Sequence, residues 1–519
     1  MAENEVQGEW TLPEGWVWTT IGEACAVNPH VTRPDGFEDD TLISFVPMAA
    51  VDEVNGVIAS PEIRPIGEVW RGYKRFSEGD VIFAKITPCM ENGKAAIAKG
   101  LVNGIGLGST EFHVLRPPDG ILPQWIYHFV RQESFRGDAA ARMTGTAGQL
   151  RVPATFVQEA AVPLAPLPEQ RRIVAAIETQ FTRLDAGVAA LERARANLKR
   201  YRATVLKAAC EGRLVPTEAA LARAEGRAYE PADQLLARIL AQSHARWEAA
   251  HPGKRYVEPA PPDTGNLLEL PEGWCWATVE QLASLEPRSI QSGPFGSSLH
   301  HSEFQDSGVL AIGIDNVLDG QFSMGKQHRI SPEKFEQLGK YKARPLDVLI
   351  TVMATVGRCC VVPANLETAI ITKHVYRISV NQELVIPFYL MFALLGGQEV
   401  RRQVLGETRG QTRPGINGTI LKQIAIPIPP FAEQHCIVAE VERRLSVVAA
   451  LEREVEAALA RAARLRQSIL KRAFEGRLVP QDPDDEPASA LLERIRAARE
   501  APATGGKKTR TRQNRLPMM

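Results

Sequence analysis

The chain has no long apolar run and no cysteine framework. No window of about eighteen uncharged apolar residues occurs in its 519 residues, and the first residues lack the basic and apolar parts of a signal peptide. The seven cysteines are scattered without a CxxC pair, so they predict neither a zinc site nor disulfides. We therefore expect a cytoplasmic protein with reduced cysteines and no membrane segment.

The chain also lacks an excess of charge of either sign, since 61 basic residues balance 61 acidic ones. Residues 1–168 contain 13 basic and 21 acidic residues, a net charge of −8, whereas residues 169–216 contain 10 and 5, a net charge of +5. This is not the basic footprint of a stand-alone nucleic-acid binder. Any DNA binding would depend on local patches or on partners.

Catalytic motifs are missing as well. The sequence contains no Walker loop and no GxGxxG after a strand. The spaced acidic residues and the lysine of a metal-dependent nuclease cannot be singled out either. The Asn-Pro-Pro-aromatic tetrad of amino-group methylation is absent, because Asn28-Pro29-His30 lacks the second proline. Cys359 and Cys360 could be considered as nucleophiles, but their apolar surroundings favour a buried strand edge. We expect a non-catalytic chain.

A long helix occurs twice in the sequence. Residues 169–216 and 433–480 both begin with Glu-Gln and end with EGRLVP, an offset of 264 at each end, while the shared string VAALER has an offset of 260. That slip of about one helical turn keeps the apolar face in place. Prolines up to Pro168 predict that the first helix begins at Glu169, and Gly212 should end it. Its apolar positions are spaced by threes and fours, as in a coiled coil: Ile173, Ile177, Phe181, Leu184, Val188, Leu191, Leu198 and Val205.

The regions before the two helices are also related. The pentad LPEGW opens each of them, at residues 12–16 and 270–274. In the first region we expect strands within 42–51, 79–86 and 110–115, a helix from Pro123 to about Arg136, and a polar glycine-rich loop at 143–151. Three further string matches indicate a duplicated α+β fold: Asp80-Val-Ile with Asp347-Val-Leu, His113-Val-Leu-Arg116 with His374-Val-Tyr-Arg377, and Gly148-Gln-x-Arg151 with Gly410-Gln-x-Arg413. The matched histidines His113 and His374 are predicted to be scaffold.

A short segment follows each long helix. The connector contains one predicted amphipathic helix, from Ala232 to about Ala249, and Leu491–Ile495 repeats its Leu235–Ile239. The basic tail at 507–515 is expected to be disordered. The predicted organisation is a first globular domain (1–168), a long helix (169–216), a connector (217–267), a second globular domain (268–432), a second long helix (433–480), and a satellite helix with the tail (481–519).

Antiparallel pairing of the two long helices would relate the two globular domains by a pseudo-twofold axis. Two linked domains of this kind could read two sites on one straight partner, for which DNA is the obvious polymer. A coiled-coil scaffold that presents two interaction domains without binding DNA is the alternative from the residues alone. A further alternative is that the chain is itself an enzyme. It would then have to methylate its substrate alone, with S-adenosylmethionine and without a partner subunit.

The repeated LPEGW, the helix start LPEQRRIV, the closing EGRLVP and the segment Gly293–Leu299 resemble those of specificity subunits of type I restriction-modification systems, over nearly the whole chain. The resemblance implies that each globular domain is a target recognition domain for one half of a split double-stranded DNA sequence. It implies that the helices set the gap and dock two methyltransferase subunits, which restriction subunits then join. S-adenosylmethionine, ATP and Mg²⁺ would belong to those partners, with no cofactor in this chain.

The duplication suggests which residues contact DNA. Residues shared by the two domains should be scaffold or phosphate contacts, and residues that differ should read bases. We predict backbone contacts from Gln149, Arg151, Gln411 and Arg413, with pairing inside its own domain as the alternative for each arginine. The predicted base contacts are unshared polar residues near the same loops and strands: Lys85, Arg142, Thr144, Thr146, Ser292, Ser297, Ser298, Lys373 and Arg409. Arginine or lysine would favour guanine, and serine or threonine would discriminate weakly.

Overall fold

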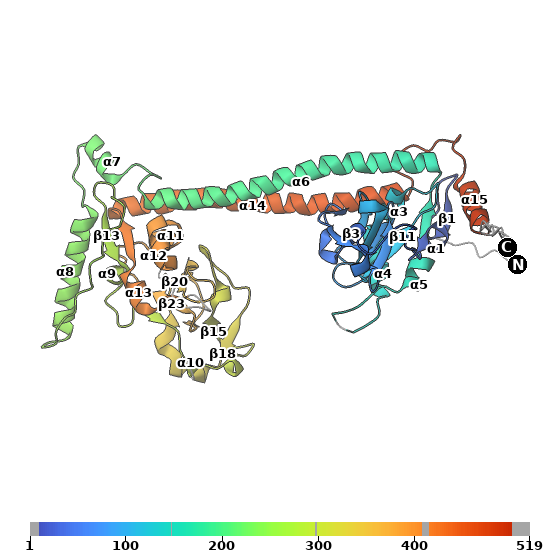
Figure 1. The fold of residues 1–519 in the computed structure, drawn as a ribbon. Helices are drawn as coiled ribbons and strands as arrows, with labels where there is room; N and C mark the ends of the chain where they lie inside the picture. The colour runs from blue at the N-terminus through green and yellow to red at the C-terminus, as the bar shows by residue number, and fades with distance from the viewer. Residues whose placement is uncertain (1–9, 147, 296–297, 407–414, 501–519) are drawn as a thin grey trace, which may run out of the picture. The chain divides into compact units, whose positions relative to one another are not determined.

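A computed structural model describes residues 10–146, 148–295, 298–406 and 415–500, and the chain forms two compact units (Figure 1). Unit 1 consists of Met1–Leu191 together with Ala457–Met519, and unit 2 is the continuous segment Glu192–Glu456. Unit 1 therefore combines the beginning of the chain with its end, including the C-terminal part of the second long helix.

Unit 1 is built on two four-stranded sheets. Its strands are β1 (Val17–Thr20), β2 (Ala26–Val27), β3 (Leu42–Val46), β4 (Val51–Asp52), β5 (Val57–Ile58), β6 (Glu62–Pro65), β7 (Lys74–Ser77), β8 (Val81–Ala84), β9 (Ala95–Ile97), β10 (Ile105–Gly108), β11 (Phe112–Arg116) and β12 (Ala161–Leu164). One sheet has the order β2-β11-β8-β9 and the other the order β6-β3-β10-β7. The pairs β1-β12 and β4-β5 form two smaller sheets.

Helices cover the outer faces of these sheets. The helices of unit 1 outside the long pair are α1 (Ile21–Ala24), α2 (Ile66–Val69), α3 (Pro123–Val130), α4 (Glu133–Ala141), α5 (Ala154–Glu159) and α15 (Ala488–Glu500). Because successive side chains of a strand point to opposite faces, Val81 and Phe83 of β8 pack towards the helices, whereas Ile82 packs towards the second sheet. There Ile82 meets Phe76 of β7 and Phe112 of β11, so a second core lies between the sheets, in addition to the larger core beneath the helices.

Unit 2 repeats this order of strands. Its strands are β13 (Cys275–Thr278), β14 (Ile290–Ser292), β15 (Val309–Ile312), β16 (Val317–Leu318), β17 (Gln321–Phe322), β18 (His328–Ile330), β19 (Lys342–Ala343), β20 (Val348–Thr351), β21 (Cys359–Val361), β22 (Ala369–Ile371), β23 (Val375–Ile378) and β24 (Ala425–Ile428). The sheets β14-β23-β20-β21 and β18-β15-β22-β19 match the two sheets of unit 1 strand for strand. The expected duplicated α+β fold is confirmed, and Cys359 and Cys360 lie buried in β21.

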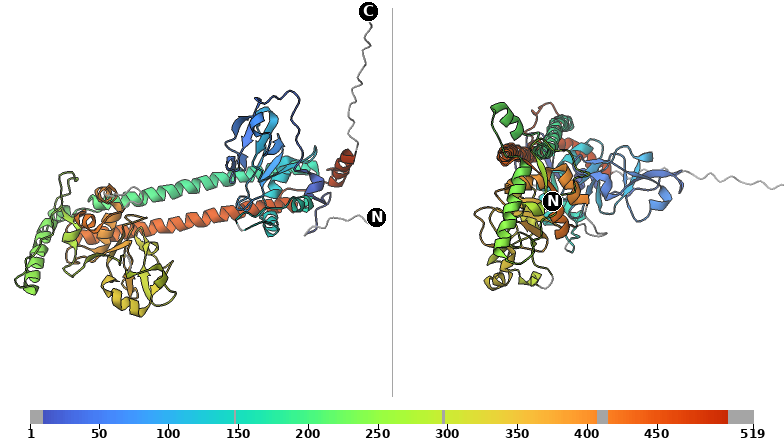
Figure 2. Two further views of the ribbon diagram at one scale, coloured as in Figure 1. Left: turned by 60° about the horizontal axis from the view of Figure 1, so that its bottom comes forward. Right: turned by 90° about the vertical axis from the view of Figure 1, so that its left-hand side faces the viewer.

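The helices of unit 2 outside the long pair are α7 (Glu218–Glu225), α8 (Ala232–Ala250), α9 (Val279–Leu282), α10 (Pro332–Leu338), α11 (Pro387–Gly396), α12 (Gln398–Gly406) and α13 (Gly418–Gln423). The prediction of a single helix in the connector was wrong, because α7 precedes α8. Thr217 caps α7 by accepting a hydrogen bond from the N–H of Ala220 at 3.3 Å, and Gly226 ends it at φ +65°. In Figure 2 the green α8 lies along one side of unit 2.

The two long helices, α6 (Leu167–Cys210) and α14 (Phe431–Phe474), have 44 residues each. Their equal length confirms the prediction from the repeat. The expected start of α6 at Glu169 was wrong by two residues, because Pro168 lies in the first turn. The N–H groups of a first turn have no acceptor inside the helix, so a proline at this position removes no intrahelical hydrogen bond. Gly212 follows the end of α6 at φ +65°, as expected.

Within each unit α6 and α14 run antiparallel. In unit 1, Arg466 forms an ion pair with Asp185, and its guanidinium lies 4.3 Å from the ring of Phe181. In unit 2, Arg202 pairs with Glu452 at 3.3 Å, and Leu206 near the end of α6 shares a core with Ile437 near the start of α14. Each unit thus holds part of a two-helix coil.

The predicted single helix from Pro123 to about Arg136 was also wrong, because two helices occupy this stretch. Helix α3 ends at Val130, and Gln132 at φ −64° and ψ 143° has an extended backbone before α4. The change of direction lets Phe129 of α3 and Phe135 of α4 meet in one core, with ring centres 5.4 Å apart. Packing against the sheet therefore overrides a local sequence that could continue as a helix.

The repeated LPEGW and Glu-Gln motifs join each long helix to its own globular part. In unit 1, the indole N–H of Trp16 donates to the Glu169 carboxylate at 2.9 Å, and in unit 2 Trp274 donates to Glu433 at 3.1 Å. The glutamine that follows each glutamate binds the backbone at the start of an earlier helix, α3 in unit 1 and α11 in unit 2. Gln170 accepts from Leu122 N–H at 3.1 Å, as Gln434 does from Ile386 N–H at 2.9 Å. All four Glu and Gln side chains are buried, so these contacts fix the direction of the helix.

The buried carboxyl group of Glu433 makes the stability of unit 2 depend on pH. Burial raises its pKa from 4.5 to about 7, because the charged form is disfavoured away from water. Between these values the folded chain holds a proton that the unfolded chain has released. The free energy of unfolding of unit 2 should therefore fall by about 3 kcal/mol as pH rises from 4.5 to 7. Hydrogen exchange of unit 2 peptides in urea, in the full chain at several pH values, measures this fall.

The variant Glu433→Gln should lose this part of the pH dependence, because the amide does not titrate. The matched control is Glu454→Gln, which changes an exposed carboxylate on the same helix and should retain the wild-type fall. If the free energy of unfolding of unit 2 fell equally with pH in the wild type and in Glu433→Gln, Glu433 would have the same pKa in the folded and unfolded chains.

The two satellite helices complete the cores of the two units. In unit 1, Ala488 of α15 donates its N–H to Gly15 O at 2.8 Å, and Leu491 and Ile495 join the core beneath β1 and α3. In unit 2, Ala232 of α8 donates to Gly273 O at 2.8 Å. Figure 1 shows α15 in red beside the blue β1. The predicted repeat of the satellite helix is confirmed.

Candidate DNA interface

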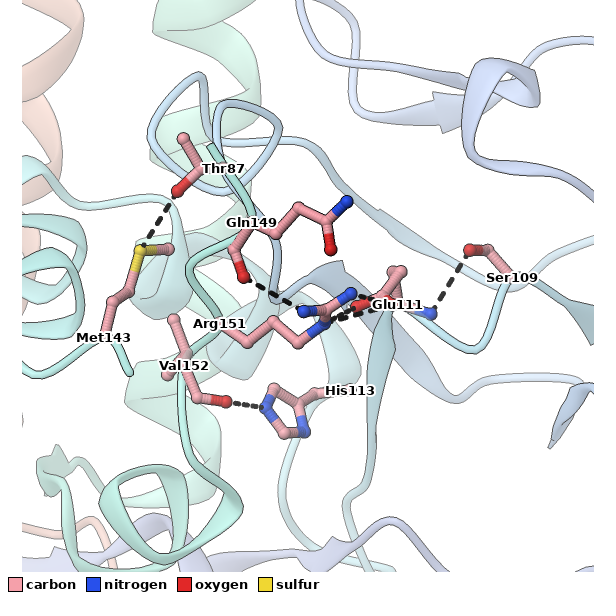
Figure 3. Close-up of polar contacts among 8 residues, drawn as sticks. All are labelled: Thr87, Ser109, Glu111, His113, Met143, Gln149, Arg151 and Val152. Carbon is pink, nitrogen blue, oxygen red and sulfur yellow. Dashed lines mark hydrogen bonds and ion pairs between the residues drawn. The ribbon is translucent and has the colours of Figure 1, made fainter. Parts of the chain in front are cut away.

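The candidate interface of unit 1 lies where β8 and β11 meet the hairpin of residues 144–151. Lys85 follows β8, and its N–H donates to the carbonyl of Glu111, just before β11, at 2.9 Å. The carbonyl of Lys85 accepts from Val152 N–H at 2.8 Å, which attaches the end of the hairpin. Three segments that are far apart in the sequence therefore meet at one end of the sheet (Figure 3).

The hairpin presents an exposed polar tip. Thr144 and Arg151 exchange backbone hydrogen bonds of 3.0 and 2.9 Å at its base, and Gln149 N–H donates to Thr146 O at 2.9 Å nearer the tip. Gly145 has φ +131°, and a Cβ atom there would lie 2.8 Å from Gln149 O, so the turn requires glycine. Thr144, Thr146 and Gln149 are all exposed. The predicted residues of this loop are thus available to a partner.

Arg151 is held by its own domain. Its guanidinium makes three contacts of 2.9 to 3.1 Å with the Glu111 carboxylate and donates to Gln149 O at 2.9 Å (Figure 3). These bonds with Arg151 lower the pKa of Glu111, and the charge of Lys85 lowers it further. Pairing inside its own domain, the alternative to a phosphate contact, describes Arg151 in this structure. The arginine fixes the hairpin to the sheet, and its phosphate contact stays a prediction.

His113 lies beneath this site and has a structural role. Its Nε2 donates to Val152 O at 2.9 Å, and its Nδ1 accepts from the side-chain amide of Asn28 at 3.1 Å. Burial lowers the pKa of His113 from 6.5 to about 4, so the ring is neutral near pH 7. The prediction that His113 is scaffold is confirmed.

The predicted equivalence of His113 and His374 was wrong by two residues. Val352 follows β20 as Lys85 follows β8, and its N–H donates to the carbonyl of His374 at 3.0 Å. His374 therefore occupies the position of Glu111. In the strand ladders His113 faces Phe83 while Tyr376 faces Ile350, so Tyr376 takes the place of His113. A slip of two residues keeps every side chain on its face of the sheet, so the hydrophobic pattern alone could not reveal it.

The match of Arg413 with Arg151 fails for a similar reason. Arg151 is bridged to Ile86 and is followed by Val152, which donates to Lys85 O. In unit 2 the bridge to Met353 comes from Gly415, and Ile416 donates to Val352 O at 3.1 Å. The backbone position of Arg151 thus belongs to Gly415. Arg409, Gln411 and Arg413 themselves lie outside the described residues, as does Ser297.

Arg142 follows α4 and contacts side chains of α4 and α5. Its guanidinium lies 5.2 Å from the ring of Phe156 and 3.9 Å from the Asp138 carboxylate. It lines a groove of about 790 Å³ together with Trp10 and Trp18, and neither Thr146 nor Gln149 lines this groove. The structure therefore groups Lys85, Thr144, Thr146, Gln149 and Arg151 but not Arg142.

In unit 2 the structure brings Ser292 close to Lys373. Ser292 at the end of β14 pairs with Tyr376, and a Cβ atom on Gly293 would lie 2.3 Å from the backbone of Thr372. Gly293 is thus pressed against the segment that carries Lys373. Lys373 and Ser298 are exposed, and Ser292 is half-buried. The contact supports Ser292 and Lys373 as parts of one surface.

The sequence also contains a signal that the site prediction missed. Residues 70–75, WRGYKR, place Arg71, Lys74 and Arg75 between aromatic residues in a region of net negative charge. Lys74 begins β7 and is paired with Gly108, three residues before Glu111. Basic residues that alternate with aromatic ones are typical of nucleic-acid contacts.

Two classes of site are absent from the part of the chain that the structure describes. No group of three or more His, Cys, Asp or Glu side chains could hold a metal ion there. No helix among those residues is long and apolar enough to cross a membrane.

Comparison with known proteins identifies the family. Residues 308–460 match the family model of the type I restriction modification DNA specificity domain. The specificity subunit of the type I restriction enzyme EcoEI from Escherichia coli is 27% identical over 508 residues, covering 88% of this chain and 82% of that one. The chain is similar over most of its length to specificity subunits of type I restriction-modification systems.

Other members of the family agree. The EcoAI specificity subunit from Escherichia coli is 33% identical over 321 residues, about half of each chain, with coverages of 53% and 52%. A chain solved in work on complex assembly and conformational transition of the type I R-M system has 25% identity and a TM-score of 0.64, covering 90% of this chain and all of that one. The resemblance indicated by LPEGW and EGRLVP is confirmed, and the comparisons do not support the scaffold alternative. The chain itself has a duplicated fold with two long helices.

Proposed function

We propose that this specificity subunit reads a two-part sequence in double-stranded DNA, with unit 1 and unit 2 each recognising one half. The observation that carries the proposal is that the two units share one arrangement of strands but differ in the side chains at the candidate interface. The sheets match strand for strand, while Lys85, Glu111 and Arg151 of unit 1 are replaced by Val352, His374 and Gly415. One fold that presents different side chains at one place suits the reading of two different sequences.

The long helices offer a surface for partner subunits. Four large apolar side chains on them are about half exposed: Tyr201 (45%), Val447 (52%), Leu451 (47%) and Leu465 (51%). Exposed apolar groups of this size favour protein contacts. We infer that two methyltransferase subunits dock on these helices and supply S-adenosylmethionine. Restriction subunits that use ATP and Mg²⁺ complete the cytoplasmic complex, and the chain itself holds no cofactor.

The test combines this chain with its methyltransferase subunits and maps methylated positions in genomic DNA. We expect methylation at one two-part sequence when the complex is complete, and none with either component alone plus S-adenosylmethionine, since the chain supplies only recognition. Methylation by this chain alone would make it an enzyme. Unchanged methylation by the partners without it would leave it as a scaffold.

A further inference from the structure

Lys74 and Lys85 come from different sheets and approach the same end of the core of unit 1. Lys74 is at the start of β7, on the same strand face as Phe76, which is fully buried between the sheets. Lys85 follows β8 of the other sheet, where the hairpin is attached. Lys74 pairs with Gly108, three residues before Glu111, whose carbonyl accepts the N–H of Lys85 at 2.9 Å, so the two lysines flank one short segment. Burial lowers the pKa of Lys74, and the positive charge of Lys85 lowers it further.

In the part of the chain that the structure describes, no carboxylate forms an ion pair with Lys74 or Lys85. Both oxygens of the neighbouring Glu111 carboxylate are bound by Arg151. Within the described residues, neither Lys74 nor Lys85 forms an ion pair or a side-chain hydrogen bond, and both are partly exposed. Two ammonium groups that approach one end of the core and lack acceptors would suit a ligand with acceptor atoms side by side. On DNA these are the oxygens of a phosphate, or O6 and N7 of guanine in the major groove.

The duplicated fold distinguishes between these two ligands. Ser77 and Arg344 each donate their N–H at 2.7 Å to the aspartate three residues later, so Lys74 and Tyr341, three residues earlier, are equivalent. Lys85 is equivalent to Val352, as shown above. Phosphates are the same in both halves of a target, so residues that bind them should persist in both units. Here both lysines are replaced by uncharged side chains.

We propose that Lys74 and Lys85 together read the edge of one guanine in the half-site of unit 1. This inference rests on the proposed function. Arg151 and Glu111 hold the hairpin beside the two lysines, and Thr146 and Gln149 at its exposed tip flank the same base. Lys74 is therefore a specificity-determining residue that acts only on the half-site of unit 1.

The test uses the complete methyltransferase complex with Lys74→Met, Lys85→Met and the double variant, since methionine keeps the length of the side chain and removes the donor and the charge. Affinity is measured on duplexes in which each base pair of the unit 1 half-site is replaced in turn. We expect each variant to lose a preference of about tenfold or more at one G·C pair. The unit 2 half-site should be read as before.

Lys99→Met is the matched control, because Lys99 is an exposed lysine at the opposite end of β8. It should leave the preference at every position unchanged. An equal loss of affinity for all duplexes with a weaker salt dependence would assign the lysines to phosphate and overturn the proposal. Unchanged binding by the double variant would overturn it too. Absence of sequence-specific methylation in the wild-type complex would instead contradict the proposed function.

Discussion

A chain that ends at Pro480 is expected to leave unit 1 unfolded while unit 2 remains intact. The truncation removes α15, whose Leu491, Leu492 and Ile495 are 6%, 3% and 5% exposed. Loss of one buried leucine or isoleucine side chain costs about 2 to 5 kcal/mol. Three such losses are comparable with the whole stability of a domain, about 5 to 15 kcal/mol. The truncation also removes Asp485, which pairs with Arg172 of α6 at 2.7 Å.

Hydrogen exchange of the truncated chain measures this effect region by region. We expect rapid exchange in the β2-β11-β8-β9 sheet and wild-type protection in the matching sheet of unit 2, whose satellite helix α8 is still present. A chain that ends at residue 500 is the control, because it keeps α15 and all the contacts named here. Wild-type protection of unit 1 in the shorter chain would show that α15 is dispensable.

Removal of one turn from each long helix is expected to change the spacing between the two half-sites but not their sequences. Residues 190–193 of α6 and 459–462 of α14 lie in sequence between the residues of the Asp185–Arg466 and Arg202–Glu452 pairs, so their deletion removes one turn from each helix between these two pairs. Four residues correspond to about 6 Å of helix, and DNA rises about 3.4 Å per base pair. A spacer shorter by about one or two base pairs should therefore be preferred. Mapping of methylated sites for the complete complex gives the spacer directly.

A variant of unchanged length separates the effect of length from that of sequence. Alanine at Glu192, Arg193 and Arg461 changes the same two segments and should retain the wild-type spacer. If the shortened chain still methylated sites with the wild-type spacer, the helices would not determine it. A change in the half-site sequences themselves would show that shortening had disturbed the recognition domains.

The parts of the fold that could be predicted are those that depend on short, contiguous patterns in the sequence. The long helices, their equal length and the satellite helix were visible because identical strings recur with the apolar spacing of a helix. The buried Trp16–Glu169 and Trp274–Glu433 pairs now explain why LPEGW and Glu-Gln recur together. Motifs that are far apart in sequence were repeated because they are in contact.

The candidate site was harder to predict because strand pairing is non-local. String matching aligned His113 with His374, whereas the ladders align His374 with Glu111, two residues earlier. Lys74 was missed because its relation to Lys85 depends on two sheets that pack face to face. Which strands meet is decided by the packed core, and no short window of sequence contains that information.

The division of unit 1 between the two parts of the chain has a consequence for synthesis on the ribosome. Unit 2 is continuous and can complete its core soon after Glu456 has emerged. Unit 1 begins first but lacks α15 until residue 500 has been added. The order of maturation is thus the reverse of the usual order, in which N-terminal domains fold first. A chain terminated before α15 would carry an unfinished first domain, so only translation products that extend through α15 would mature into a working subunit.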